Sequence, residues 1–240
     1  MVNAPILEYL TLQDDYLPCY VLNNLTSLVK AYINVGGYSI QFAATKQRTD
    51  RVLVILREIR SVKYLSLGSR TMGALDYAGD NSLPLFPNLI RLELHVHKCY
   101  GWIRLLDLLN SMPNLLYLVL EKSKKFQCAG DDASKDFKFV EQEVVPYFLL
   151  MHLQEIEINR FQGLRDELKL IEFFLRNSKV LRKIEINAVN LEEKQEREFL
   201  EKLLMFPSGS ITCQILITRK ENFAPASRYI PSSTVELTHM

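Results

Sequence analysis

The residues spaced most like metal ligands are two histidines and a cysteine in one short run, His95-x-His97-x-Cys99. Residues two apart on a β-strand project from the same face, so these side chains could approach one ion. A closed structural zinc site takes four protein ligands, and no fourth ligand stands at a recognisable spacing. We therefore expect no metal and no other cofactor in this protein.

Residue arrangements typical of catalysis are missing from the sequence. Gly36-Gly37 lacks the neighbours that a phosphate-binding loop needs, and no Gly-x-Ser-x-Gly elbow occurs. Cys99 stands close to His97, but near neighbours on one strand are poorly placed to share a proton. We therefore expect no catalytic residues, and an enzyme is the function class that this sequence favours least.

The sequence instead repeats one pattern, leucine-x-x-leucine-x-leucine with conservative swaps. The steps between middle positions run from 21 residues (Leu10 to Ala31) to 38 residues (Leu118 to Ile156), about the size of one leucine-rich unit. The end of each unit predicts a short strand whose leucines point inward, and stacked units bury those leucines in one core. The copies are Leu7/Leu10/Leu12, Leu28/Ala31/Ile33, Val62/Leu65/Leu67, Leu89/Leu92/Leu94, Leu115/Leu118/Leu120, Leu153/Ile156/Ile158 and Leu181/Ile184/Ile186.

Stretches with apolar residues at helical spacing lie between these strands. The alternation of strand and helix predicts an α/β leucine-rich-repeat solenoid, or horseshoe, with parallel strands on its concave face. Two segments, 68–85 and 122–138, are expected to be irregular. The expected helices are 51–59, 102–112, 166–177 and 191–206, and a last strand is expected at 213–217.

Composition limits the function classes. The chain has 240 residues, of which 48% are hydrophobic, and a formal charge of +1. That charge balance gives no electrostatic reason to bind nucleic acid or an anionic membrane. No apolar run approaches the roughly 20 residues that span a bilayer. The start of the chain does not resemble a signal peptide and the cysteines are scattered, so a cytoplasmic or nuclear protein is expected.

Strand alternation identifies the side chains that face away from the core. Tyrosine and arginine, which most often anchor protein interfaces, are prominent among them. We interpret this outward set as the candidate surface for a protein partner. The candidate residues are Tyr9, Lys30, Tyr32, Tyr64, Arg91, Glu93, His95 and Tyr117.

The string from Val145 to Ile158 resembles the start of the FBD domain found at the end of many plant F-box proteins. The match continues through Phe161-Gln162-Gly163 and Val180–Ile184, and Phe206-Pro207 resembles its close. Upstream, Phe86-Pro87-Asn88-Leu89 resembles the leucine-rich repeats of the same proteins. We therefore divide the chain into repeats at 1–143, an FBD-like domain continuing the solenoid at 144–217, and a disordered tail at 218–240.

The resemblance implies a function. In that family an F-box docks on the adaptor of a cullin-based ubiquitin ligase, and the repeats hold the protein to be ubiquitinated. We expect no F-box before Asn3, because the first repeat begins at Pro5. Three explanations stay open: a truncated product or incomplete gene, a paralogue that binds a target without delivering it, or adaptor binding through another surface.

The sequence favours a non-catalytic protein-binding module that resembles the substrate-recognition part of an F-box subunit. One alternative is an orphan module that titrates a partner without recruiting the ligase. The other is a hormone-type small-molecule receptor with a pocket among Arg91, His95 and Tyr117. We also expect an FBD-like cap over the carboxyl end and an uncovered amino end, where Leu7, Leu10 and Leu12 would promote self-association.

Overall fold

The structure of the chain is a computed structural model. It describes nine parts of the chain. They are residues 2–15, 19–36, 46–78, 83–97, 104–122, 139, 145–189, 193–219 and 234–238.

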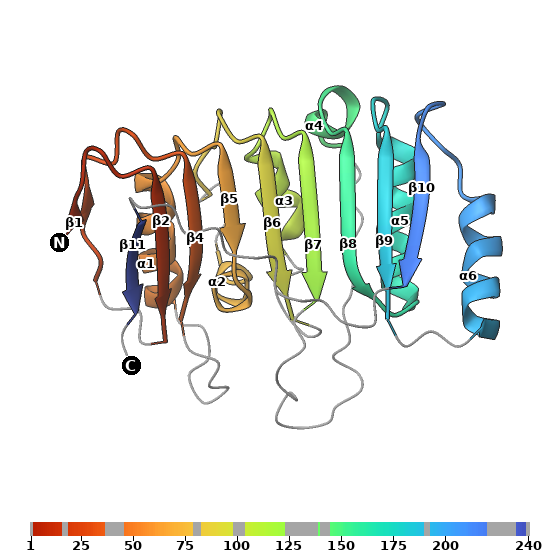
Figure 1. The fold of residues 1–240 in the computed structure, drawn as a ribbon, viewed down its shortest axis with the longest axis horizontal. Coiled ribbons are helices and arrows are strands. Elements are labelled where there is room, and N and C mark those ends of the chain that lie inside the picture. The colour runs from red at the N-terminus through yellow and green to blue at the C-terminus, as the bar shows by residue number, and fades with distance from the viewer. Residues whose placement is uncertain are drawn as a thin grey trace.

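One parallel sheet organises these parts (Figure 1). From β2 to β10 its strands lie in chain order, as stacked repeats require, and β11 is added beside β2. The strand order is β10-β9-β8-β7-β6-β5-β4-β2-β11, and β1 and β3 form a separate parallel pair. The strands are β1 (Val2–Asn3), β2 (Tyr9–Asp14), β3 (Leu22–Asn23), β4 (Lys30–Val35), β5 (Tyr64–Leu67), β6 (Arg91–Val96), β7 (Tyr117–Lys122), β8 (Glu155–Phe161), β9 (Lys183–Ala188), β10 (Gln214–Arg219) and β11 (Thr234–Thr238).

Helices cover one face of the sheet. In Figure 1, α1, α3 and α5 lie behind the strands, and no described helix lies in front. None of the described helices is both long and apolar enough to cross a bilayer. The helices are α1 (Lys46–Glu58), α2 (Ser69–Leu75), α3 (Leu105–Asn110), α4 (Tyr147–Met151), α5 (Arg165–Asn177) and α6 (Glu193–Met205).

The core consists of the inward residues of the repeat pattern. Leu12, Ile33, Leu67 and Leu94 are each 0% exposed and follow one another across the successive strands β2, β4, β5 and β6. Stacking therefore buries the leucines as the pattern predicts. The sheet passes without interruption from the repeats into the FBD-like segment, because β7 pairs with β8.

The amino end corrects one expectation. Leu7, Leu10 and Leu12 are 5%, 2% and 0% exposed, so they do not form an uncovered apolar patch. Two features cover this end: the small β1–β3 sheet, and β11, which pairs in parallel with β2 from Thr234 opposite Tyr9.

Two segments differ from their predicted state. The segment 68–85, expected to be a loop, contains α2, because Thr71, Met72 and Leu75 are buried and the Thr71 hydroxyl donates a hydrogen bond to the Ile33 carbonyl oxygen. The tail expected to be disordered from residue 218 contains the end of β10 and the whole of β11, so the expectation is wrong for those residues. Most of the segment 122–138 lies outside the described residues.

Candidate binding face

The strand register aligns outward side chains in three rows across the sheet. The rows run at right angles to the strands, so each row takes one residue from each successive repeat. The first row is Tyr9, Lys30, Tyr64, Arg91, Tyr117, Glu155 and Lys183. The second row is Thr11, Tyr32, Ser66, Glu93, Val119, Glu157 and Glu185. The third row includes Gln13, Asn34, His95, Glu121, Asn159 and Asn187.

The first row is the most accessible part of this face. Tyr64 is 41% exposed, the Arg91 side chain is 43% exposed, and Tyr117 is half-buried. The strand alternation read from the sequence places Tyr9, Lys30, Tyr64, Arg91 and Tyr117 at one equivalent position of successive strands, and the register confirms this alignment. Aromatic rings and a guanidinium held on rigid strands make a surface suited to contact with another molecule.

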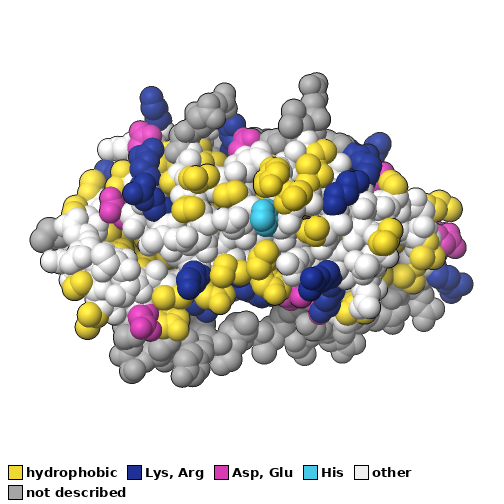
Figure 2. Space-filling view, turned by 90° about the horizontal axis from the view of Figure 1, so that it is seen from above, with side chains coloured by type: hydrophobic (Ala, Val, Ile, Leu, Met, Phe, Trp, Pro, Cys, Tyr) yellow, Lys and Arg dark blue, Asp and Glu magenta, His cyan; other side chains and the backbone are white. Residues whose placement is uncertain are grey.

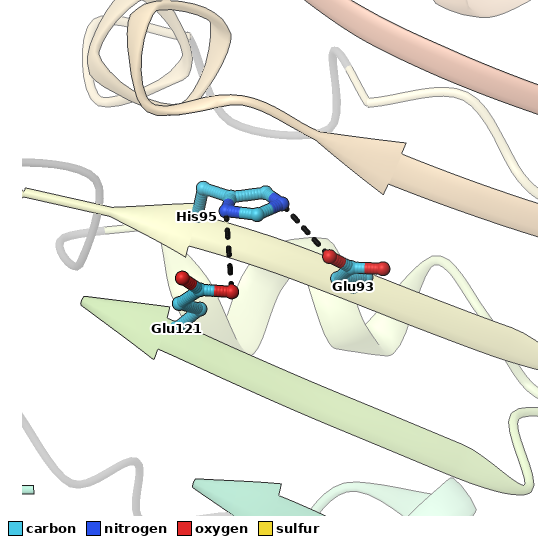
Figure 3. A group of neighbouring side chains, drawn as sticks. All are labelled: Glu93, His95 and Glu121. Atoms are coloured by element: carbon cyan, nitrogen blue, oxygen red, sulfur yellow. Dashed lines mark ion pairs between the residues drawn. The ribbon is translucent and has the colours of Figure 1, made fainter. Parts of the chain in front are cut away.

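His95 lies at the centre of an ion-paired group (Figure 3). Its Nε2 lies 2.9 Å from Glu93 Oε1 and its Nδ1 lies 3.8 Å from Glu121 Oε2. Tyr32 presents its ring edge-on to the imidazole at a centroid distance of 6.4 Å. The hydrogen bond from His95 lowers the pKa of Glu93, which keeps that carboxylate ionised.

Two carboxylates and an imidazole are also side chains that bind metal ions. The ligand atoms of Glu93, His95 and Glu121 lie within 4.8 Å of one another. The two carboxylates, however, approach opposite nitrogens of one imidazole, and the ring can offer only one nitrogen to a given ion. The observed arrangement is therefore that of an ion-paired triad. In the sequence motif, His97 is buried at 2% exposure, and Cys99 lies outside the described residues.

A β-bulge adds an arginine to this group. The pairing of β8 with β9 shifts between Asn159 and Phe161, and Arg160 there has φ 62°. The bulge directs the Arg160 guanidinium to Glu121, with Nε 3.3 Å from Oε1, and turns Phe161 into the core at 0% exposure. Arg160 thus adds a cation to the group that contains His95.

A small hollow opens on the same face over β6 to β9. It is lined by charged side chains of both signs around Tyr117 and has a volume of about 40 Å³. Arg91 approaches Glu157 at 4.0 Å, and Lys183 pairs with Glu185 at 2.8 Å. Glu185 and its neighbours raise the pKa of Lys183, so the hollow carries fixed charges of both signs.

In the third row, the side chains on β8 and β9 are buried and joined by hydrogen bonds. Asn187 donates to the Asn159 side-chain oxygen at 2.6 Å, and Asn159 donates to Glu157 at 3.0 Å. Thr218 of β10 donates to Asn187. The bond from Asn159 holds the carboxylate of Glu157, in the second row, in place.

Figure 2 views the molecule from the end where the strands begin. Basic, acidic and apolar side chains are interspersed over this surface, without a broad area of one sign. Side chains of both charges are therefore mixed at this end of the sheet, as they are on the strands.

Sequence reasoning identified eight residues of the face, and Glu121 and Arg160 are among the charged residues that it did not identify. All eight predicted residues lie in the three rows, and their role in binding a partner stays a prediction. Glu121 was missed, yet continuing the alternation from Tyr117 and Val119 would have identified it. Arg160 could not be identified in that way, because alternation from Ile156 and Ile158 places it in the core.

The comparisons with known proteins agree with the repeat architecture. Residues 141–186 match the FBD family. This segment includes α4, β8, α5 and the start of β9, which carry Glu155, Glu157 and Lys183 of the face. No solved structure matches the chain.

Several proteins of Arabidopsis thaliana are similar to nearly the whole chain. F-box/FBD/LRR-repeat protein At1g78750 is 30% identical over 90% of this chain and 46% of its own length. F-box/FBD/LRR-repeat protein At5g22660 is 30% identical over 91% and 48%, and F-box/LRR-repeat protein 13 is 29% identical over 90% and 47%. The chain thus spans about half the length of these relatives. Over nearly its whole length, the chain is thus similar to plant F-box/LRR-repeat proteins that carry an FBD domain.

Proposed function

We propose that this chain is a non-catalytic module that binds a protein through the three rows of the sheet face. The observation that carries the proposal is the first row, where tyrosines alternate with Lys30 and Arg91 on consecutive strands. The face is the side of an α/β leucine-rich-repeat solenoid that we take to be concave. Repeat proteins use such extended surfaces for binding.

The relatives' names connect the module to F-box proteins. We therefore propose that the bound protein is a target for ubiquitination, selected by the part of an F-box subunit to which this chain corresponds. The free thiols of Cys19 and Cys213 fit a reducing compartment, so we place this activity in the cytosol or nucleus. We also propose that the chain divides at residue 143 into leucine-rich repeats and an FBD-like domain that continues the solenoid.

The hormone-receptor alternative gains no support from the hollow. Pockets for small organic ligands have volumes of about 300–1,000 Å³. The hollow beside Arg91 and Tyr117 is far smaller, at about 40 Å³, and is lined mainly by charged groups. The observed face is better suited to side chains of a protein than to an enclosed small molecule.

The test is affinity capture from plant cells with quantitative mass spectrometry. A Tyr64→Ala/Arg91→Ala/Tyr117→Ala variant should lose the proteins captured by the natural chain. A matched variant changes the same residue types away from the face, at Arg60, Tyr77 and Tyr147, and should retain them. Equal capture by both variants would exclude the rows as the binding surface.

The same capture distinguishes the routes to the ligase. Adaptor and cullin subunits that accompany the target would support recruitment to a ubiquitin ligase. A target captured reproducibly without them would instead support a module that titrates its partner. In both cases, capture of the target should be lost when Tyr64, Arg91 and Tyr117 of the first row are changed to alanine.

A further inference from the structure

β11 pairs at the end of the sheet that lies farthest from the strand preceding it in the chain. β10 ends the strand order on one side, and β11 ends it on the other side, next to β2 (Figure 1). The strands between them follow the chain order from β2 to β10. The chain therefore crosses the whole sheet before it adds its last described strand.

The edge of β2 accepts β11 as one more parallel strand. In their register Val235 stands opposite Leu10, and Leu237 stands opposite Leu12. Leu10 and Leu12 belong to the buried repeat pattern, and β2 already pairs with β4 along its other edge. Every copy of the chain carries the same strand, so β11 of a second copy fits this edge in the same register.

The end of β10 and the start of β11 lie far apart. The nine strands are separated by eight spacings of roughly 4.8 Å, which amount to about 38 Å across the sheet. The register places Thr234 level with Gln214, at the other end of β10 from Arg219. With the length of one strand added, the direct distance from Arg219 to Thr234 is about 42 Å.

This distance is large for the fifteen residue steps that separate Arg219 from Thr234. A chain of that length reaches at most about 50–54 Å when fully extended. A relaxed flexible chain of the same length spans only about 19–23 Å. A connection that must span about twice its relaxed length gives its end a low effective concentration at the binding site. Pairing of β11 with β2 within one chain therefore has only a weak advantage over pairing between two chains.

We propose that β11 binds the β2 edge of a second copy of the chain, which returns its own β11 in the same way. This reciprocal exchange closes a two-fold dimer in which an identical element is swapped. Two copies that lie side by side in opposite directions bring the end of β10 in each near β2 of the other. The strand pairing is the same as within one chain, and release of the stretched connection favours the dimer.

The first test lengthens the connection in the full chain. Light scattering after size exclusion should show the natural chain rising from 27.8 kDa toward twice that mass as its concentration increases. Sixteen glycine and serine residues inserted after residue 226 should raise the concentration of half-dimerisation by more than about tenfold, because a longer connection favours pairing within one chain. The same insertion after residue 239, beyond β11, is the matched control and should leave that concentration unchanged.

The second test shortens the connection. After deletion of residues 223–226, eleven residue steps remain and reach at most about 36–40 Å, which is less than the distance to be spanned. This variant should be a dimer at every concentration. A monomeric deletion variant would overturn the proposal, as would a natural chain that stays monomeric or a dimer that responds equally to the two insertions.

A cross-link identifies the strands that meet between the copies. Thr11 and Glu236 are partners in the register of β2 and β11. A Thr11→Cys copy mixed with a Glu236→Cys copy should form a disulfide between residues 11 and 236 under mild oxidation, as read by peptide mapping. A Glu58→Cys copy, changed on the exposed side of α1, is the control for the second copy and should form no such link. A dimer without the link between residues 11 and 236 would have another interface and would overturn the proposal.

Discussion

Lys122 Nζ lies 2.6 Å from Glu167 Oε1, and this pair joins the end of β7 to the first turn of α5. The side chains are only 10% and 4% exposed. The other Glu167 oxygen accepts the backbone N–H groups of Gln162 and Leu164 at 3.1 and 3.0 Å. One carboxylate thus caps the helix of the FBD-like segment and binds a cation from the preceding repeat.

Lys122→Met should destabilise the protein by about 3–5 kcal/mol, because removing one partner of a buried pair leaves an uncompensated charge. Urea unfolding measures the loss. Lys169→Met is the matched control: its pair with Asp166 spans 2.9 Å, but the Lys169 side chain is 48% exposed, so about 0–1 kcal/mol is expected.

The double variant Lys122→Met/Glu167→Leu measures the interaction energy between the two side chains, apart from the contacts that each makes with other residues. It should cost less than the sum of the two single changes, because neither partner is left alone. Equal losses for Lys122→Met and Lys169→Met would show that the buried pair contributes little.

Gly68→Ala should be destabilising by about 1–3 kcal/mol, as overpacking of a filled site usually is. A Cβ at residue 68 would overlap the Asn34 side chain, whose oxygen accepts the Arg70 backbone N–H at 3.3 Å. Thermal unfolding should show a lower Tm. Adding Asn34→Ala to Gly68→Ala should restore part of the lost Tm. If the Tm does not rise, the overlap with the Asn34 side chain is not the cause of the destabilisation.

Glu93 should make stability depend on acid pH. His95 lowers its folded pKa below the ordinary 4.5, so the carboxylate stabilises the folded state above pH 4.5. That contribution is lost as pH falls through the folded pKa. In denaturant titrations from neutral to acid pH, Glu93→Gln should show a shallower decline than the natural chain. Glu58→Gln, on the exposed side of α1, should leave the profile unchanged.

Phe199→Ala should loosen α6 and cost about 3–5 kcal/mol. Phe199 is 3% exposed, and its ring centroid lies 4.4 Å from that of the fully buried Phe161. Leu204→Ala on the same helix is the control, because that side chain is 86% exposed, and it should change stability by less than about 0.5 kcal/mol. Similar values for the two changes would mean that α6 is not anchored through Phe199.

The sequence by itself determined the repeating strand, its inward leucines and the alignment of Tyr9, Lys30, Tyr64, Arg91 and Tyr117. These follow from a period of two within each strand and from one conserved spacing between leucines in each repeat. Both are local properties, so no knowledge of distant contacts was needed. The FBD-like segment was identified in the same way, from consecutive residues.

Only the tertiary structure decided the features that depend on distant parts of the chain. The bulge at Arg160 arises where β8 pairs with β9, and it reverses the faces that alternation assigns to Arg160 and Phe161. The amino edge of the sheet was also misjudged, because β11 covers it by pairing with β2. Strand pairing at an edge joins residues far apart in sequence, and a local pattern holds no information about which strand arrives there.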